Sequence, residues 1–379
     1  MVNSLFQQSS WSAPTVFLTG VTGFLGGAFL SDLLQSSFDG EVVCLVRADD
    51  DETAEERVRR SVGRFGAPDD PLPTNVKVLR GDLLSEDWHR SRHLDNVTHV
   101  LHLAASTSFG NSRAIRTTNV GGALSVAKAM RGRRLERFIY TGTAAICGAS
   151  PAPVVHEDDY PDERATHLVA YTRSKAEAER LLTERFADLP LIVARPSIVL
   201  GHTELGCKPS GSIFWVLRAV EALRFVTWDM ENRIDGVPVD WAASALRHLL
   251  FAPRLKHTRY HVSAGRGSCV RWNDMAAEYA RLHGGESEDR YEVGEIRQLT
   301  AKRVLQAVGD GHPRHLLHAL ELYYRFCSRD LVFDNCRLLK EGIPAPPRFT
   351  DYMQVCEESS ISSIYEQMRS DLELSLTLA

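Results

Sequence analysis

The sequence lacks the marks of several protein classes. No apolar run approaches the roughly 18 residues of a membrane-spanning helix. The polar first 14 residues have no cationic start followed by an apolar stretch, so we expect no signal peptide. Lys and Arg (44) do not outnumber Asp and Glu (49), and a net charge of −5 argues against a general nucleic-acid binder. Gly and Pro are too few for a low-complexity chain. A folded protein without a membrane span is therefore predicted.

The seven cysteines are spread too widely to suggest a shared site. No two form a Cys-x-x-Cys pair and no histidines stand beside them at metal spacing, so neither a disulfide framework nor a metal site is predicted. Reduced thiols are typical of the cytoplasm, which is the location we expect. The charge is uneven, because residues 351–379 hold six acidic side chains and one basic one. We expect this end to be solvated, with a partner contact as the alternative.

Hydrophobic periodicity predicts alternating strands and helices over the first 200 residues. Short runs that are apolar on both faces, as buried parallel strands are, alternate with helical stretches. This alternation is typical of an α/β fold with a Rossmann-type, doubly wound parallel sheet and a smaller C-terminal substrate lobe. The predicted strands lie at 15–19, 42–46, 76–79, 97–103, 138–141 and 191–194.

The expected division of the chain follows from where this alternation stops. After Gly201 the pattern changes to loops and helices with three tryptophans, Trp215, Trp228 and Trp241, which either line a pocket or pack a core. The expected parts are an N-terminal tail (1–14), a Rossmann domain (15–201), a mainly substrate-binding lobe (202–365) and a C-terminal tail (366–379). Within the lobe, a strand near 234–240 is expected to return and pack on the sheet.

A glycine-rich turn follows the first predicted strand. Gly20, Gly23 and Gly26 have the spacing G-x-x-G-x-x-G at a strand-to-helix junction. Such a turn lets backbone N–H groups and a helix N-terminus approach a pyrophosphate, and its position favours a dinucleotide site over an ordinary tight turn. Three further residues of this turn are expected to contact the cofactor: Thr22, Phe24 and Leu25.

The second and third strands end in candidate groups for the adenosine half of the cofactor. Arg47 stands where an NAD-binding fold carries a carboxylate, and its cation suits the 2′-phosphate of NADPH. Three aspartates follow it closely, so a loop-surface role is the alternative for Arg47. Asp82 either accepts a hydrogen bond from the adenine amino group or caps a turn.

Tyr171 and Lys175 form a candidate acid–base pair. Their i and i+4 spacing places phenol and ammonium on one face of a predicted helix. A cation that stabilises the phenolate makes a tyrosine a better general acid at neutral pH. Thr143, upstream at the end of a predicted strand, is placed to polarise the same substrate oxygen. Asn119 sits in the middle of a predicted helix, where it either fixes a kink or a water beside Lys175, or is a solvated surface amide.

Taken together, these motifs resemble those of the extended short-chain dehydrogenases/reductases over about residues 15–265. Within that family, Leu45-Val-Arg47-Ala48 and Ile234-x-x-Val-Pro238-Val-Asp240 resemble the thioester reductase and fatty acyl reductase branch. The family motifs, in chain order, are Thr19-Gly20-x-x-Gly23-x-x-Gly26, Gly81-Asp82-Leu83, His102-x-Ala104-Ala105, Asn119-Val120-x-Gly122, Tyr140-Thr-Gly-Thr143 through Gly148, Tyr171-x-x-x-Lys175 and Arg195-Pro196-Ser197.

The resemblance implies roles for these residues. Thr143 and Tyr171 would hydrogen-bond the carbonyl being reduced, while Lys175 would hold the nicotinamide ribose and lower the tyrosine pKa. Cys147 departs from the pattern, because many family members carry tyrosine there. We expect Cys147 to be a small buried side chain and not a reactive thiol. The motif residues implied to border the cofactor are Leu83, Ala104, Ala105, Pro196 and Ser197.

The implied function is an NADPH-dependent reductase that transfers hydride to an acyl thioester, delivered by coenzyme A or by a separate carrier protein, and releases an aldehyde or alcohol. The alternatives within the family are a ketone or aldehyde reductase and a sugar-nucleotide epimerase. A non-catalytic NADPH sensor is the alternative of another class, although such proteins usually lack the tyrosine and lysine. The segment His156-Glu157-Asp158-Asp159 is expected to be a loop rim and not a metal site.

Overall fold

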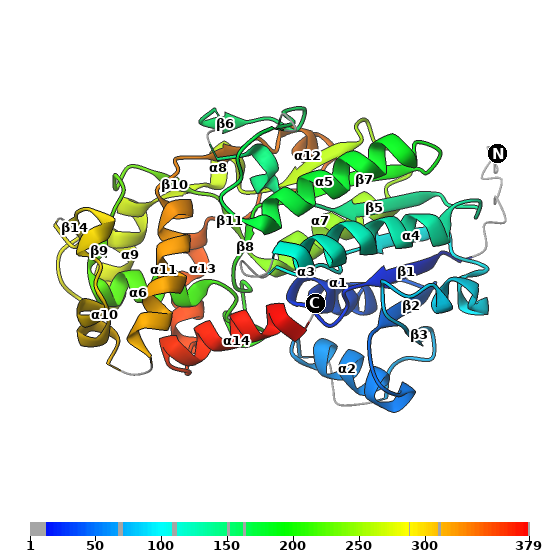
Figure 1. Ribbon diagram of the computed structural model, residues 1–379, viewed down its shortest axis with the longest axis horizontal. Coiled ribbons are helices and arrows are strands. Elements are labelled where there is room, and N and C mark those ends of the chain that lie inside the picture. The colour runs from blue at the N-terminus through cyan, green and yellow to red at the C-terminus, as the bar shows by residue number, and fades with distance from the viewer. Residues whose placement is uncertain are drawn as a thin grey trace, which may run out of the picture.

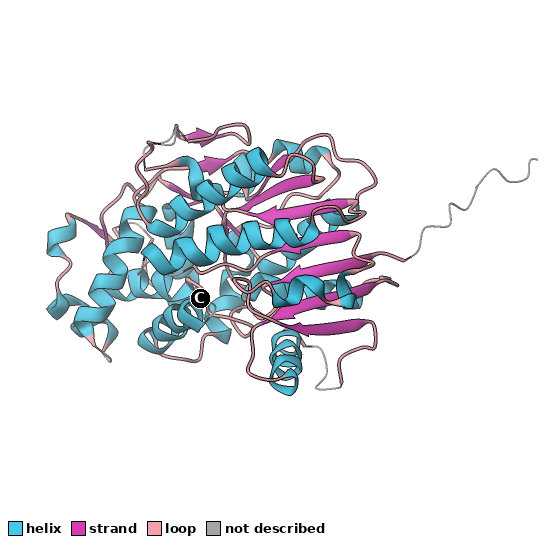
Figure 2. Ribbon diagram, turned by 45° about the vertical axis from the view of Figure 1, so that its right-hand side comes forward, coloured by secondary structure: helices cyan, strands magenta, loops and turns pink. Residues whose placement is uncertain are grey.

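A seven-stranded parallel sheet between two layers of helices forms one side of the molecule, and a mainly helical lobe forms the other (Figures 1 and 2). The computed structural model describes residues 13–66, 71–107, 112–149, 152–161, 164–287, 289–309 and 312–377, with backbone alone at 112 and 372–377. Most of the expected N-terminal tail, residues 1–12, lies outside the described residues. The predicted Rossmann-type fold is confirmed.

The sheet has the strand order β12-β7-β5-β4-β1-β2-β3, with every pair of neighbours parallel. Alternate side chains enter opposite cores, since Val16 and Leu18 pack on one face and Phe17 on the other. The edge strand β12 comes from the region expected to be lobe. The strands are β1 (Thr15–Thr19), β2 (Glu41–Val46), β3 (Val76–Arg80), β4 (His99–His102), β5 (Arg137–Thr141), β7 (Leu191–Pro196) and β12 (Arg259–Val262).

Two sets of helices cover the two faces of the sheet. One face packs against α1 (Phe24–Gln35), α2 (Asp51–Gly63) and α7 (Val239–Phe251). The other face packs against two helical segments, of which the first changes pitch along its length. That first segment comprises α3 (Ser112–Arg116), the π-helical turn η3 (Thr117–Gly121) and α4 (Gly122–Met130), and the second is α5 (Ala170–Arg185).

The lobe has its own apolar core, in which Trp215 and Trp228 are buried. Trp241 instead packs in the core under the sheet, so none of the three tryptophans is a cavity wall. The lobe helices are α6 (Phe214–Leu223), α9 (Trp272–His283), α10 (Ala301–Val308), α11 (Pro313–Cys327), α13 (Phe349–Ser359) and α14 (Ile364–Thr377). Its paired short strands are β9 (Phe225–Val226) with β14 (Glu292–Val293) and β10 (Arg233–Ile234) with β13 (Val270–Arg271).

The strand expected to return to the sheet near residues 234–240 does not do so. The strand expected near 234–240 is two short strands, β10 and β11 (Gly236–Val237), and neither joins the seven-stranded sheet. Instead, β11 pairs with β8 (Ile198–Val199), and Pro238 ends it as the N-cap of α7, because proline has no N–H to continue a ladder. The chain returns to the sheet through α7 and β12. The remaining elements are β6 (Val154–Val155), β15 (Val332–Phe333), α8 (Gly265–Ser268), α12 (Cys336–Lys340), η1 (Asp87–Arg90), η2 (Arg92–Leu94), η4 (Ala144–Cys147) and η5 (Ile296–Gln298).

The acidic end of the chain is folded. Residues 364–377 form α14, which packs against α6 and buries Gln367 and Met368, so the expectation of a solvated tail is wrong as far as Asp371. In Figure 1 this helix runs from the lobe toward α1 and α3. Among the helices of the described residues, none has the length and apolarity that crossing a membrane requires.

Candidate active site

One cavity of about 400 Å³ lies where the carboxyl ends of the sheet strands meet the lobe. Parallel α/β sheets bind ligands at this edge. The cavity brings together thirteen of the residues selected from the sequence, which come from the turn after β1, the start of α1, the loops after β4 and β5, the end of β7 with the residue after it, and α5. They are Gly20, Thr22, Gly23, Phe24, Leu25, Gly26, Ala104, Ala105, Thr143, Tyr171, Lys175, Pro196 and Ser197.

The glycine turn fits a dinucleotide because it leaves no room for side chains. Gly20 has a φ of 78°, and a Cβ there would lie 2.5 Å from the Ala104 nitrogen. A Cβ on Gly26 would lie 2.1 Å from the Gly20 carbonyl oxygen. Gly23 is the N-cap of α1 and offers no side-chain acceptor to the first-turn N–H groups. The turn therefore presents backbone donors and a helix N-terminus to the cavity, as a pyrophosphate requires.

Thr143 and Tyr171 converge in the cavity. Thr143 follows β5, and its Oγ1 donates to the Pro196 carbonyl oxygen at 3.4 Å, while Tyr171 lies in the first turn of α5 on the same cavity wall. Burial raises the pKa of Tyr171 to about 12, although the nearby Thr143 side chain opposes this rise. The resemblance implied a lowered pKa for Tyr171, but burial raises it, and the nearby ammonium of Lys175 donates to the Thr141 carbonyl oxygen instead. A buried phenol with this pKa is a proton donor at neutral pH.

Lys175 is fully buried one turn further along α5. Its Nζ donates to the Thr141 carbonyl oxygen at 2.8 Å and lies 5.2 Å from the centre of the Tyr140 ring. Burial lowers the pKa of this ammonium to about 7. The partners of the Lys175 ammonium are thus a carbonyl oxygen and an aromatic ring, and neither carries a full negative charge. Because Lys175 lines the cavity, the cavity suits an anionic ligand.

Asn119 lies outside the cavity and clamps the loop that forms one of its walls. It is 2% exposed in the π-helical turn η3, so the alternative of a solvated surface amide is wrong. Its Oδ1 accepts from the Ser106 N–H at 2.7 Å, while its Nδ2 donates to the Ser106 oxygen and to Ser174 Oγ. Ser174 in turn donates to the Tyr171 carbonyl. Asn119 thus ties the Ala104–Ala105 loop to α5.

Arg47, Asp82 and Leu83 are not among the residues that line the cavity. Arg47 Nη1 lies 4.0 Å from Asp82 Oδ2, and both side chains are 44% exposed. Asp82 also accepts the Leu84 N–H at 2.8 Å, which is the turn-capping contact weighed as an alternative. Leu83 packs in the core against α4.

A second guanidinium lies beside Arg47. Arg57, one turn inside α2, donates to the Arg47 carbonyl oxygen. Burial, and then the charge of Arg47, lower the pKa of Arg57. Two adjacent cations at the end of β2 repel each other, and an anion bound between them would relieve this repulsion. The sequence showed Arg57 only as one charge on a charged helix, so its position beside Arg47 was not foreseen.

Arg64 was also missed, and it does line the cavity. Its Nη2 donates to the Thr22 oxygen at 3.0 Å and to Ser61 Oγ at 2.9 Å. The buried Nε of Arg64 has no hydrogen-bond partner among the described residues. Burial lowers the pKa of the Arg64 guanidinium. A desolvated guanidinium held on the glycine turn suits a phosphate group. Helical periodicity alone could not show which of the arginines near 57–64 faces this turn.

A buried ion pair fixes the helix that carries Tyr171 and Lys175. Arg195 on β7 contacts Glu179 on α5 through two hydrogen bonds of 2.6 and 3.0 Å, and both side chains are at most 1% exposed. This bidentate geometry sets the position of α5 against the sheet. It also fixes the start of the loop with Pro196 and Ser197, which border the cavity.

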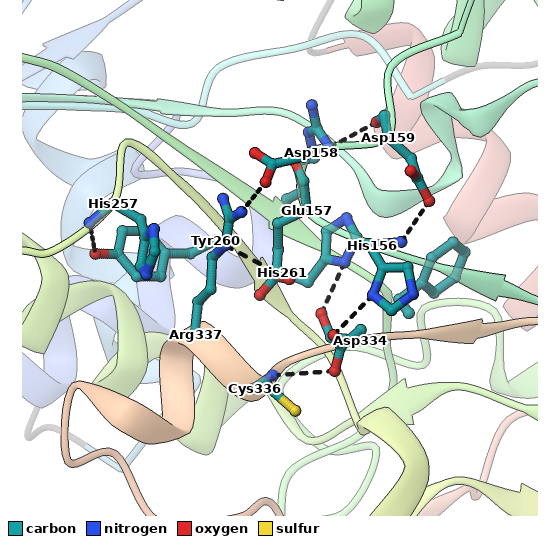
Figure 3. A network of polar contacts seen from close by, with 12 residues as sticks. His156, Glu157, Asp158, Asp159, His257, Tyr260, His261, Asp334, Cys336 and Arg337 are labelled. Carbon is teal, nitrogen blue, oxygen red and sulfur yellow. Dashed lines mark hydrogen bonds and ion pairs between the residues drawn. The ribbon is translucent and has the colours of Figure 1, made fainter.

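The segment 154–159 is joined by polar contacts to residues 334–337, which lie far from it in the sequence (Figure 3). His156 Nδ1 lies 2.9 Å from Asp334 Oδ2, and Arg337 contacts Asp158. Next to Asp334, Phe333 lines the cavity, so this network holds a cavity wall. The segment is a loop rim, and the described residues contain no group of three or more side chains arranged to hold a metal.

Cys147 is largely buried beside this segment. Burial raises the pKa of its thiol, and its Sγ lies 3.7 Å from Arg329 Nη2. A thiol with a raised pKa is a poor nucleophile, which agrees with the expected small buried side chain.

The side of the cavity that faces away from the glycine turn comes from the lobe. None of its residues was selected from the sequence, because they lie far along the chain from the motifs and carry no local signature. They are Ser210, Ser212, Ile213, Tyr323, Phe326 and Asp371, joined by Phe333 of β15.

The chain is similar to known proteins in sequence and in fold. The family model described as "Male sterility protein" matches residues 18–246. The chain is 30% identical over 267 residues to the Glycine betaine reductase ATRR of Emericella nidulans, covering 66% of this chain and 21% of that protein. The chain spans only 21% to 28% of the length of this and three similar curated relatives.

Two solved structures show the likeness of the fold. The terminal R domain from the myxalamid PKS-NRPS biosynthetic pathway superposes with a TM-score of 0.78 at 23% identity, over 92% of this chain and 91% of that one. The UDP-glucuronic acid 4-epimerase from Bacillus cereus, in complex with NAD, superposes with a TM-score of 0.60 at 15% identity, over 91% and 96% of the two chains. At these identities the likeness concerns the fold alone.

Proposed function

The chain belongs to the Male sterility protein family, the thioester reductase branch of the extended short-chain dehydrogenases/reductases, and from this premise we propose that it is an NADPH-dependent thioester reductase. Hydride would pass to the carbonyl carbon of an acyl thioester, and an aldehyde or an alcohol would be released. The observation that carries the proposal is the cavity at the sheet edge, in which a glycine turn, Thr143, Tyr171 and Lys175 meet a wall built by the lobe.

The residues of the cavity fit a nicotinamide dinucleotide. The glycine turn and the N-terminus of α1 would hold the pyrophosphate, with Arg64 as a further cation on the same turn. The ammonium of Lys175 would hold the ribose next to the nicotinamide ring, beside Ala104 and Pro196. When bound, the reduced cofactor supplies the hydride.

Thr143 and Tyr171 would act on the substrate oxygen. Both side chains line the cavity, so both hydroxyls could donate hydrogen bonds to a carbonyl placed there. As hydride adds to the carbonyl carbon, the C=O π electrons move to oxygen, and the two hydroxyls stabilise this oxyanion. Tyr171 then gives its proton to that oxygen.

The resulting hemithioacetal breaks its C–S bond. The electrons of that bond leave with sulfur, which takes up a proton, while the O–H electrons form the aldehyde C=O. The products are one free thiol, one aldehyde and one oxidised cofactor for each thioester and proton consumed. A second hydride would convert the aldehyde to the alcohol.

We propose NADPH and not NADH as the reductant. Arg47 and Arg57 lie side by side at the end of β2, where the fold places the adenosine ribose, and a 2′-phosphate would be the anion that they share. Asp82 would then orient Arg47 from 4.0 Å away.

A carrier protein or coenzyme A would deliver the acyl group as a thioester. Both supply a long flexible arm, which suits a cavity that is set between the sheet edge and the lobe. A cytoplasmic location stays a prediction, based on the unpaired thiols of the described cysteines.

The test is NADPH oxidation by the purified protein with acyl-coenzyme A and acyl-pantetheine thioesters, beside simple aldehydes and ketones. Thioester-dependent oxidation with release of thiol, lost in Tyr171→Phe, is the expected result. Turnover of free carbonyls alone would contradict the proposal in favour of a ketone or aldehyde reductase. Tight NADPH binding without any turnover would point instead to the sensor.

A further inference from the structure

One wall of the cavity is built from two segments that lie far apart in the sequence. Ile198 of β8 and Phe333 of β15 both line the cavity. Among the described residues, β8 pairs with β11 and β15 pairs with β6, so no strand pairing joins the two segments. Contacts of another kind must therefore fix the distance between Ile198 and Phe333.

Asp235 connects these two segments, although it is not among the described residues that line the cavity. It is 4% exposed and lies between β10 and β11. Its Oδ2 accepts the Phe333 N–H at 3.1 Å, and its backbone carbonyl oxygen accepts the Ile198 N–H at 3.3 Å. Its Oδ1 accepts the N–H of Ala264, two residues after β12, at 2.7 Å. One buried residue thus joins β8, β15 and the chain that leaves the edge of the sheet.

The backbone of Phe333 depends on side chains for its hydrogen bonds. The N–H groups of the residues before and after Phe333 donate to the segment that contains β6. Phe333 faces the other way, where a second strand would supply the partners in a wider sheet. There the Asp235 carboxylate accepts its N–H, and the Ser263 hydroxyl donates to its oxygen at 2.8 Å. These two side chains therefore take the place of a strand and hold Phe333 at the cavity.

A carboxylate suits the position of Asp235 because two donors need two acceptor oxygens. An asparagine has one acceptor oxygen, and its NH₂ group would face the N–H of either Ala264 or Phe333. Burial raises the pKa of Asp235, and the N–H groups of Ala264 and Phe333 oppose this rise because they stabilise the ionised form. A side chain that only filled space here would not need a charge, since burying a charge is costly.

From these contacts we infer that Asp235 is a positioning residue, which fixes Phe333 relative to Ile198 and thereby sets how well the cavity holds a long chain. An apolar chain that reaches both side chains gains contact only where they stay in place. A chain too short to reach them depends less on Asp235. This inference rests on the proposed function for the kind of chain that enters the cavity.

The test compares two thioethers that cannot be reduced, S-ethyl-pantetheine and S-hexyl-pantetheine, with NADP⁺ bound. Calorimetry measures their dissociation constants in the unchanged protein and in Asp235→Asn. The variant should lose more affinity for the hexyl compound, and the ratio of the two constants should shift by about fourfold or more, which corresponds to one buried methylene group. Asp32→Asn is the matched control, since Asp32 pairs with Arg247 between α1 and α7, and it should keep the ratio.

A double-mutant cycle tests whether Asp235 acts through Phe333. Phe333→Ala removes the side chain that the carboxylate positions, so adding Asp235→Asn to it should shift the ratio by no more than about twofold. A larger further shift would mean that Asp235 acts by another route, and would overturn the inference. An equal loss of affinity for both thioethers in Asp235→Asn alone would also overturn it, because a merely structural role weakens both alike.

Ser263→Ala provides a second variant in case Asp235→Asn does not fold. It removes the donor to the Phe333 oxygen, so the ratio should shift in the same direction as in Asp235→Asn. Affinity for NADP⁺ serves as the check that each variant is folded. In that case an unchanged ratio in folded Ser263→Ala would contradict the positioning role.

Failure of the proposed function is distinguishable from failure of this inference. If thioesters are reduced and the ratio does not shift in Asp235→Asn, the proposed function stands and the inference falls. If no thioester is reduced and neither thioether binds, the ratio is taken instead from kcat/KM for hexanal and propanal with NADPH. A shift of that ratio in Asp235→Asn would support the positioning role in an aldehyde reductase. An unshifted ratio, or no turnover of either aldehyde, would overturn it.

Discussion

Burial of the Lys175 ammonium is the largest electrostatic penalty in the candidate site. Its pKa falls from 10.5 to about 7, because the ammonium is fully buried. Below pH 7 the folded protein carries the whole penalty, roughly 5 kcal/mol at about 1.4 kcal/mol per pKa unit. Between pH 7 and 10.5 the folded state binds fewer protons than the unfolded state, so the penalty shrinks as pH rises.

Replacing this lysine should therefore stabilise the cofactor-free protein while abolishing turnover. Lys175→Met removes the penalty and loses one hydrogen bond to the Thr141 oxygen, so a net gain of roughly 3 kcal/mol is expected at pH 6. The gain should fade toward pH 10. Urea unfolding at pH 6 and pH 9.5 measures this, and a variant less stable at pH 6, or a gain that does not depend on pH, would contradict the account.

The paired guanidiniums give a second prediction at the scale of single residues. Arg47→Ala and Arg57→Ala should each weaken NADPH binding about tenfold or more and leave NADH binding within about twofold, since only NADPH carries the 2′-phosphate. Fluorescence titration with both cofactors measures the two constants. Arg60→Ala on the exposed side of α2 is the matched control. Equal losses for NADPH and NADH would remove the role proposed for the pair.

Among the elements, the π-helical turn η3 shows how an irregular helix serves the site. The turn buries Asn119, whose amide replaces the backbone partners that Ser106 lacks in its loop. Such turns are frequent at functional sites, where they redirect one side chain out of the helical register. The sequence indicated a kink at Asn119 but could not show that its amide clamps a loop 13 residues away.

Asn119→Ala should destabilise the protein and loosen the cavity wall. It leaves the Ser106 N–H and oxygen without their partner, which costs about 2 to 4 kcal/mol. The Ala104–Ala105 loop is then less fixed, so NADPH binding should weaken as well. Chemical denaturation and a cofactor titration measure both effects. Thr117→Ala, at an exposed position of the same turn, should change neither, and a silent Asn119→Ala would refute the clamp.

Helix α14 shows where prediction from the sequence fails at the scale of elements. Its acidic composition suggested a solvated end. Instead, Met368 is buried in the lobe and the indole N–H of Trp215 donates to Asp371, so α14 packs on the lobe. The contacts that bury Asp371 join residues 156 positions apart, and no local pattern encodes such a pairing. The glycine turn and the Tyr171–Lys175 pair were found because their geometry is local.

For the whole molecule, the order of strands and helices in the sheet follows from periodicity, since the central strands are buried on both faces by helices that alternate with them along the chain. The lobe does not follow in the same way. Its core joins helices from 214 to 368 with short strands, and its cavity wall depends on how these elements pack. The edge strand β12 was therefore assigned to the lobe, although it completes the sheet.

The central claim is that hydride reaches the carbonyl carbon of a thioester. The most direct measurement uses NADPH that carries deuterium at the transferred position, with mass analysis of the product and titration of the released thiol. The account predicts one deuterium at C1 of the aldehyde, or two at C1 of the alcohol, with one thiol for each thioester consumed. NADPH oxidation that leaves C1 unlabelled, or that releases no thiol, would contradict it.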